Sequence, residues 1–288
     1  MEKNTEYSKV LVPIDGSASS FHALEQACQL ASVEKSGILA ACIAPDYEGD
    51  LDSFVASDIM LQQMRRPCED ALAKAKEIAA RHGHTIQTVL EEGDPSSRII
   101  EIAAHRNRDL IIMGRRGLSN LERVFVGSVT QRVIGQHHGD VIVVPDNASI
   151  AWQKILVATD GSLYSQAAIQ RAICFAKAYG GAIDVLAVVD APAEFYGDAP
   201  ALLEELARKA NGYAEAAANQ AAAAGVNATA HAAEGNAYEV IPETASRLGS
   251  EIIVVGSHGR TGIRRLLLGS VAEKVIGLAR CPVMVVRP

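Results

Sequence analysis

The sequence predicts an α/β protein made of two tandem, doubly wound, parallel five-stranded sheets. Three observations support this fold class. The chain has 288 residues, which is enough for two domains of ordinary size. Segments at the beginning and end of the first half recur in the second. Within each half, short apolar runs alternate with longer stretches of helical periodicity, which is typical of parallel strands joined by right-handed helical crossovers.

The internal repeat appears at both ends of each half. Lys9–Ser17 reads KVLVPIDGS and Lys154–Ser162 reads KILVATDGS, with six of nine positions identical. Asp109–Gly135 and Glu251–Gly277 match at ten of 27 positions. Because the matched blocks keep their order, duplication of one domain is the simplest explanation. The predicted domains are residues 1–147 and 148–288.

Five strands are expected in the first half. They are Lys9–Ile14, Ile38–Ala44, Thr85–Leu90, Leu110–Met113 and Val141–Val144. Short apolar runs bounded by turn residues predict buried strands, whereas the alternation of apolar and polar residues in Thr85–Leu90 predicts a half-covered edge strand.

Helices are expected between these strands because apolar residues recur there at helical spacing. They cover Ala18–Val33 and Ile59–Arg81, begin again at Asp94-Pro95, and cover Ser128–Ile134. Pro95 suits the first turn of its helix. The second half follows the same order, with Pro242 inside its third helix, where a late start or a kink is expected.

Charge and composition exclude several classes of partner. Lys plus Arg is 27 against 34 for Asp plus Glu, a net charge of −7, and aromatic residues make up 5%. These values argue against nucleic acid or an anionic membrane as the main partner. No membrane-spanning run or secretory signal is visible, so a cytoplasmic location is expected.

The five cysteines are odd in number and never spaced as CxxC. They are expected to be reduced thiols rather than a disulfide framework or a zinc site. The histidines His82, His84, His137 and His138 are expected to be solvated, and no metal site is predicted.

The strongest candidate site is a glycine loop that occurs once in each half. Ligands bind in doubly wound sheets beyond the carboxyl ends of the strands. After Met113 the chain reads Gly114-Arg115-Arg116-Gly117, then nine residues, then Gly127-Ser128 at a predicted helix start. The second copy, Gly256–Gly259 followed by Gly269-Ser270, has the same spacing. Glycine allows close backbone approach, and a helix N-terminus attracts anions, so the loops predict phosphate binding rather than simple tight turns.

Charged side chains are expected to add to this site. Positive charge is expected from Arg115, Arg116 and Arg123 in the first copy and from His258, Arg260 and Arg264 in the second. Asp15 and Asp160 end the first strand of each half. Each carboxylate either accepts hydrogen bonds from a ribose hydroxyl or an adenine amine, or caps the following turn.

These residues resemble the universal stress protein family, and specifically its tandem-domain members. Both loops fit the family's motif G-x2-G-x9-G-[ST], and the VPIDGS and VATDGS starts and the closing VIVVP and VMVVRP strands are also similar. The resemblance covers essentially the whole chain. It implies the adenine-nucleotide α-hydrolase-like fold and a bound ATP or other adenine nucleotide, with or without Mg²⁺. The adenine would lie near the first two strands and the phosphates on the glycine loop.

The resemblance also assigns the residues of two nucleotide sites. The first consists of Pro13, Asp15, Ile43, Met113, Gly114, Arg116, Gly117, Gly127, Ser128, Val129 and Thr130. The second consists of Ala158, Asp160, Val188, Val255, Gly256, His258, Gly259, Gly269, Ser270, Val271 and Ala272. Two positions depart from the family's pattern: Arg115-Arg116 replaces the usual Ser-His, and Ala272 replaces a common Thr.

No catalytic residue is predicted. The sequence has no GxxxxGK[ST] loop, no GxGxxG fingerprint, no SGGxDS segment and no identifiable general base. The resemblance therefore implies a nucleotide-binding stress-response regulator whose bound state changes which protein partners it meets. A slow ATPase or phosphotransfer enzyme and a nucleotide-independent interaction scaffold are the alternatives.

Two further expectations concern assembly and loops. The halves are expected to pack as a pseudo-dimer through Val141–Val144 and Val283–Val286, whose apolar edges would otherwise be exposed. A homodimer of the whole chain is also plausible. Residues 45–66 and 190–203 are expected to be either solvated connections or lids and partner surfaces.

Overall fold

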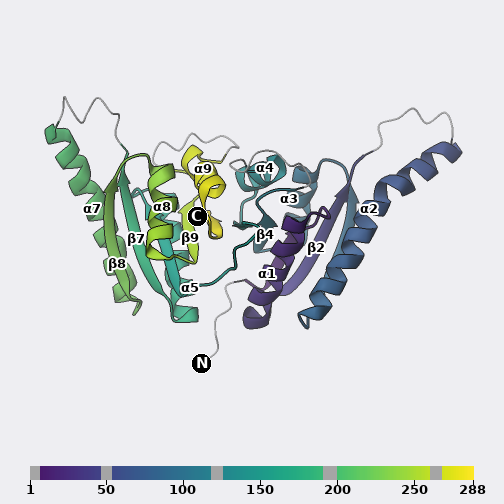
Figure 1. Ribbon diagram of the computed structural model, residues 1–288, viewed down its shortest axis with the longest axis horizontal. Helices are drawn as coiled ribbons and strands as arrows, with labels where there is room; N and C mark the ends of the chain where they lie inside the picture. The colour runs from purple at the N-terminus through teal and green to yellow at the C-terminus, as the bar shows by residue number, and fades with distance from the viewer. Residues whose placement is uncertain (1–6, 47–53, 118–125, 191–199, 260–267) are drawn as a thin grey trace. The chain divides into compact units, whose positions relative to one another are not determined.

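The computed structural model describes residues 7–46, 54–117, 126–190, 200–259 and 268–288 (Figure 1). The chain divides into two compact units, one ending at Asp146 and the other comprising Asn147–Pro288. Each unit is an α/β structure with five parallel strands, as the sequence predicts. The predicted loop surfaces at 45–66 and 190–203 lie partly outside the described residues.

The first unit alternates strands and helices along the chain. Its elements are β1 (Lys9–Pro13), α1 (Ala18–Glu34), β2 (Gly37–Ala44), α2 (Phe54–Arg81), β3 (Gln87–Glu92), α3 (Pro95–His105), β4 (Leu110–Gly114), α4 (Ser128–Gln136) and β5 (Asp140–Val144). The parallel strands lie in the order β3-β2-β1-β4-β5. The order therefore reverses between β1 and β4, and ligands of doubly wound sheets bind at such a switch point.

The second unit repeats this plan. Its elements are β6 (Lys154–Thr159), α5 (Leu163–Tyr179), β7 (Ala182–Val189), α7 (Pro200–Ala223), β8 (Ala228–Glu234), α8 (Ala237–Leu248), β9 (Ile252–Gly256), α9 (Ser270–Leu278) and β10 (Val283–Val286). The parallel order is β8-β7-β6-β9-β10. The equivalent switch point lies between β6 and β9.

The helices cover both faces of each sheet, which explains why the central strands read as uninterrupted apolar runs. In the first unit α1 packs against α2, and α3 packs against α4. Every residue of β4 and β5 is buried. The edge strand β3 is only partly buried, as its alternating pattern predicts, although it begins at Gln87 rather than at Thr85.

The third helix of the second unit does not start late. Helix α8 begins at Ala237 and continues through Pro242. Pro242 lacks the N–H that would bond within the helix, but its ring is buried. Of the two expected outcomes, a late start is therefore not observed, and a kink at Pro242 stays a prediction.

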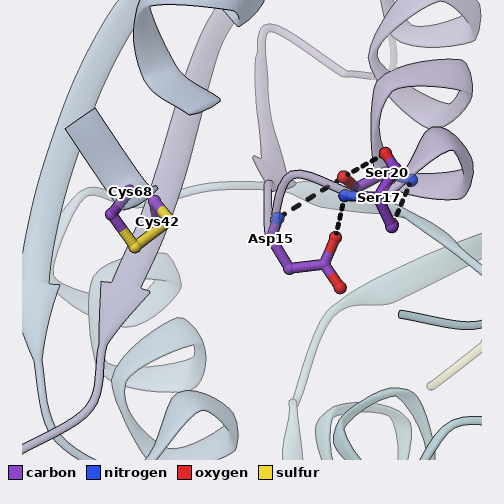
Figure 2. Close-up of a disulfide and its surroundings, with 5 residues drawn as sticks. All are labelled: Asp15, Ser17, Ser20, Cys42 and Cys68. Atoms are coloured by element: carbon purple, nitrogen blue, oxygen red, sulfur yellow. Dashed lines mark hydrogen bonds between the residues drawn. A yellow bond between two sulfur atoms is a disulfide. The ribbon is translucent and has the colours of Figure 1, made fainter. Parts of the chain in front are cut away.

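The prediction that all cysteines are reduced is also wrong. Cys42 on β2 and Cys68 on α2 form a disulfide, with their Cα atoms 5.5 Å apart (Figure 2). The two cysteines are 26 residues apart in sequence, and only the packing of α2 on β2 brings them within bonding distance. Cys28, Cys174 and Cys281 are thiols.

None of the described helices is both long and apolar enough to cross a bilayer.

Candidate functional site

Each unit contains a cavity at the carboxyl ends of its central strands. The cavity of the first unit has a volume of about 270 Å³ and that of the second about 190 Å³. The first is lined by every residue that the sequence assigns to the first site: Pro13, Asp15, Ile43, Met113, Gly114, Arg116, Gly117, Gly127, Ser128, Val129 and Thr130. The second is lined by every residue assigned to the second site: Ala158, Asp160, Val188, Val255, Gly256, His258, Gly259, Gly269, Ser270, Val271 and Ala272.

Backbone hydrogen bonds hold the glycine loop of the first unit against the end of the sheet. The N–H of Arg115 donates to the carbonyl of Val144 at 3.1 Å, and the N–H of Gly127 donates to the carbonyl of Arg115 at 3.0 Å. Gly127 is the N-cap of α4 and makes no side-chain capping bond. The N–H groups of the first helical turn have no partner within the helix, and they lie at the cavity wall formed by Ser128, Val129 and Thr130.

The second unit repeats these contacts. The N–H of Ser257 donates to the carbonyl of Val286 at 3.0 Å, and the N–H of Gly269 donates to the carbonyl of Ser257 at 3.0 Å. Gly269 is the N-cap of α9, again without a side-chain capping bond. Both predicted helix starts are confirmed, and each presents the positive end of its dipole to the cavity.

The first glycine of each loop is required by close packing. A Cβ on Gly114 would lie 2.9 Å from the carbonyl oxygen of Ser19, and one on Gly256 would lie 2.9 Å from that of Tyr164. Both neighbouring atoms are backbone atoms of the first helix, which cannot move aside cheaply. These glycines therefore allow the helix to approach the end of the strand.

The second glycine of each loop lies over a carboxylate. A Cβ on Gly117 would collide with Oδ2 of Asp15, and one on Gly259 would stand 2.9 Å from Oδ2 of Asp160. The glycine loop and the aspartate therefore form opposite parts of one cavity wall.

Each of these aspartates also caps the turn that follows it. Oδ1 of Asp15 accepts a hydrogen bond from the N–H of Ser17 at 2.9 Å (Figure 2). Oδ1 of Asp160 accepts one from the N–H of Ser162 at 3.0 Å. Each aspartate can therefore cap its turn through Oδ1 while its Oδ2 faces the glycine loop.

Thr130 marks a difference between the two cavities. Its buried hydroxyl donates to the carbonyl of Gly114 at 3.3 Å. Ala272 takes this position in the second unit and has no hydroxyl. In this structure the Thr130 hydroxyl therefore ties the helix start to the strand end.

The basic side chains predicted for the first loop are not equivalent. Arg116 lines the cavity, whereas Arg115 is absent from its lining. Burial lowers the pKa of Arg115, the neighbouring Arg116 lowers it further, and the carboxylate of Asp146 opposes both. Arg123 lies outside the described residues.

In the second unit His258 takes the place of Arg116 in the lining. Its Nδ1 is 3.1 Å from the hydroxyl of Ser257, and its ring lies 5.0 Å from that of Tyr164, measured between centroids. Arg260 and Arg264 lie outside the described residues.

Sequence reasoning missed several apolar and small lining residues. In the first cavity these are Ile14, Ser20, Ala41, Pro95 and Ile99; in the second they are Thr159, Ser165, Leu186, Ala237, Ile241 and Ser257. The first turn of α3 and of α8 provides one wall of each cavity. The signal was present: Pro95 and Ile99 are one helical turn apart, as are Ala237 and Ile241, so each pair shares a helix face.

Within the described ranges, no three His, Cys, Asp or Glu side chains gather closely enough to hold a metal ion.

Comparison with known proteins gives a consistent result over the whole chain. A model of the universal stress protein family matches residues 6–145 and again residues 151–287. A universal stress protein of Mycolicibacterium smegmatis is 30% identical over 314 aligned positions, which cover 100% of this chain and 99% of that protein. One from Methanocaldococcus jannaschii is 33% identical over 144 positions, covering 48% of this chain and 82% of that protein. The crystal structure of a universal stress protein from Archaeoglobus fulgidus aligns with a TM-score of 0.75 at 23% identity and covers 98% of this chain and 99% of that one.

Proposed function

The chain belongs to the universal stress protein family as a tandem, two-domain member, and from this premise we propose that it is a stress-response regulator that binds one adenine nucleotide in each unit. ATP is the nucleotide proposed. The bound nucleotide would change which protein partners the regulator meets.

The observation that carries this proposal is that backbone N–H groups, a carboxylate and apolar side chains line one cavity. The N-terminus of α4 offers backbone N–H groups to phosphate oxygens. Across the loop, Asp15 offers carboxylate oxygen to ribose or adenine donors. Apolar side chains, among them Ile43 and Met113, lie in the same lining and suit a flat base. The second unit combines α9, Asp160 and Val188 in the same way.

Mg²⁺ would be held mainly by the phosphates and water in this arrangement, because Mg²⁺ sites of this kind need only one or two protein oxygens. The exposed hydroxyls of Ser128 and Ser270 stand at the two helix starts, where they could donate to a phosphate oxygen. ATP binding would therefore be retained without the metal but weakened.

The experiment is to measure the stoichiometry of ATP binding by isothermal titration calorimetry. Wild type should bind two ATP per chain. Gly127→Leu should lose one site, because its side chain would project from the helix start where a phosphate is proposed. The backbone tolerates this change: φ of Gly127 is −59°, and the nearest atom to an added Cβ would be 3.5 Å away. Gly269→Leu should lose the other site.

Gly212→Leu is the matched control. It adds the same side chain on α7, where an added Cβ meets nothing within 4 Å, and it should keep two sites. Two ATP bound to each loop variant would contradict the proposal.

Steady hydrolysis of ATP by wild type, lost in Asp15→Ala plus Asp160→Ala, would favour the enzyme alternative. Partner binding that does not depend on ATP would favour the scaffold.

Several features of the proposal rest on sequence and family. They are the domain boundary between residues 147 and 148, the pseudo-dimer formed through Val141–Val144 and Val283–Val286, a homodimer of the whole chain, and the cytoplasmic location. Limited proteolysis tests the boundary, and co-purification of separately expressed halves tests the pseudo-dimer. Light scattering measures the mass of the assembly, and cell fractionation tests the location.

A further inference from the structure

The second unit has an additional cavity that opens from its proposed nucleotide site. It has a volume of about 510 Å³ and shares six lining residues with that site: Thr159, Asp160, Val188, Ala237, Gly259 and Val271. Its other walls come from the end of β7 and from α7; they include Ala187, Asp190, Leu206, Lys209, Ala210 and Tyr213. We refer to it as the side cavity. It begins at Asp160, the carboxylate that faces the proposed ribose position.

The strand residues that correspond between the two units can be identified from the sheet register. Ala41 pairs with Pro13 in the first unit, and Leu186 pairs with Ala158 in the second. The next residues along β2 and β7 are Cys42 and Ala187. The strand cysteine of the disulfide therefore corresponds to an alanine that lines the side cavity.

The helix residues correspond through the glycines that end α2 and α7. The N–H of Gly83 donates to the carbonyl of Ala80 at 3.0 Å, and the N–H of Gly225 donates to the carbonyl of Ala222 at 2.9 Å. Counted back from these glycines, Cys68 corresponds to Ala210. The helix cysteine thus also corresponds to an alanine of the side cavity.

By the same count, Ala71 corresponds to Tyr213. The contacts of Gly16 and Gly161 support this correspondence independently. A Cβ on Gly16 would approach the methyl of Ala71 at 3.8 Å, whereas one on Gly161 would lie 2.6 Å from the ring of Tyr213. Tyr213 therefore packs its ring over the turn that carries Asp160. The first unit has only a methyl group at this place.

The side chains between the second strand and the second helix therefore differ between the two units. In the first unit the buried Cys42–Cys68 bond ties β2 to α2. In the second unit two alanine methyls replace this bond and line an open space next to an aromatic ring. The two sites therefore differ in the side chains that lie beside the proposed ribose.

The charged groups at the edge of the side cavity are already engaged. Nζ of Lys209 lies 2.6 Å from Oε1 of Glu205, and Oδ2 of Asp190 accepts a hydrogen bond from the N–H of Ala237 at 3.2 Å. Asp160 is also part of the lining, and its Oδ1 accepts a hydrogen bond from the N–H of Ser162. Apart from Thr159 and Gly259, the remaining walls are alanine, valine and leucine side chains and the Tyr213 ring. This lining fits an uncharged apolar or aromatic group better than a second phosphate.

We propose that the second site binds an adenine nucleotide whose ribose carries an uncharged aromatic or apolar substituent, seated in the side cavity against Tyr213, and that the first site excludes it. This inference rests on the proposed nucleotide function. Tyr213 contributes ring contact, and Ala187 and Ala210 contribute space. Ordinary ATP would still fit both sites, because the side cavity lies beside the adenosine and not in its place.

The test compares ATP with 2′/3′-O-(N-methylanthraniloyl)-ATP, which carries one aromatic ring on the ribose. Gly127→Leu leaves the second site for titration, and Gly269→Leu leaves the first. We expect the labelled nucleotide to bind the second site at least about fivefold more tightly than ATP, since ring stacking on an aromatic side chain is worth at least this much. At the first site it should bind no more tightly than ATP.

Reciprocal variants test the role of the two alanines. In the Gly127→Leu background, Ala187→Cys plus Ala210→Cys should abolish the preference once the new cysteines are oxidised, and reduction with a dithiol should restore it. In the Gly269→Leu background, Cys42→Ala plus Cys68→Ala should raise the relative affinity of the first site for the labelled nucleotide. Tyr213→Ala should reduce the ratio of the two nucleotide affinities at the second site about fivefold.

The outcomes distinguish failure of the side-cavity proposal from failure of the proposed nucleotide function. ATP binding at both sites with the same ratio of affinities for the two nucleotides would overturn the side-cavity proposal alone. The absence of ATP binding at either site would overturn the proposed function as well. A preference that survives oxidation of the new cysteine pair would show that the aromatic group does not enter the side cavity, and would also overturn the inference.

Discussion

Gly117 and Asp15 lie so close together that a Cβ on residue 117 would collide with Oδ2 of the carboxylate. Gly259 and Asp160 repeat the relationship in the second unit. The two residues are 102 positions apart in the first unit and 99 in the second, yet a side chain at the glycine position would displace the carboxylate. The second glycine of each loop thus leaves room for the aspartate carboxylate.

Gly117→Ala should weaken ATP binding at the first site about tenfold or more, because the added methyl displaces the carboxylate that we propose as a hydrogen-bond partner of the nucleotide. Such bonds are worth about 1.5–3 kcal/mol. Calorimetry in the Gly269→Leu background measures this site alone. Gly37→Ala is the control, since its Cβ would lie 3.8 Å from the nearest atom, the carbonyl oxygen of Ser8. An unchanged Kd in Gly117→Ala would show that the position of Asp15 does not matter for binding.

Breaking the Cys42–Cys68 bond should destabilise the first unit by about 3 kcal/mol, because it releases a loop of 26 residues in the unfolded chain. Urea denaturation with and without a dithiol measures the difference. Cys174→Ala should not abolish the dithiol effect, because Cys174 is not part of the bond. If denaturation is insensitive to dithiol in the wild type, the bond does not contribute to stability.

Asp94→Ala should destabilise the first unit by about 1 kcal/mol, a typical value for loss of an N-cap. Oδ1 of Asp94 accepts from the N–H of Ser97 at 2.9 Å. Asn236→Ala, at the equivalent cap of α8, should cost less because Asn236 makes no side-chain capping bond. Chemical denaturation of both variants gives the comparison, and equal losses would be inconsistent with the observed caps.

The contribution of Asp94 should depend on pH. Hydrogen bonds from the hydroxyl of Ser96 and from Ser97 lower the pKa of Asp94 from 3.8 to about 2. A carboxylate whose pKa is lowered on folding stabilises the protein above its unfolded pKa and loses this effect as the pH falls. The difference in stability between wild type and Asp94→Ala should therefore be constant above about pH 4 and shrink between pH 4 and pH 2. A difference that grows on acidification would contradict the assignment.

Cys28 and Cys281 should resist alkylation in the folded protein. Burial raises the pKa of both thiols to about 11, and the carboxylate of Glu25 adds to the shift at Cys28. Relative to an ordinary thiol with a pKa of 9.0, the reactive thiolate at pH 8 is reduced about a hundredfold. Mass spectrometry after a timed iodoacetamide pulse measures the rate. Fast labelling of either cysteine before unfolding would mean that it is not held as the structure shows.

The glycine loops and helix starts could be predicted from sequence because their chemistry lies in short segments and occurs twice. Gly127 ends a fixed spacing and precedes a helical pattern, so the start of α4 follows from local rules. Pro95 and Ile99 were missed as cavity residues because their helical spacing shows only that they share one face of α3, and not that this face lines the cavity. Their place depends on packing between elements, which periodicity does not specify.

The sequence by itself determined that this protein consists of two α/β units with a glycine loop after the fourth strand of each. Hydrophobic periodicity and turn residues are local properties, and duplication makes them visible twice. Only the tertiary structure decided that Cys42 meets Cys68 and that their counterparts Ala187 and Ala210 line an open cavity. These outcomes depend on how a helix and a strand from separate segments pack together, and that packing is set by side chains distant in sequence.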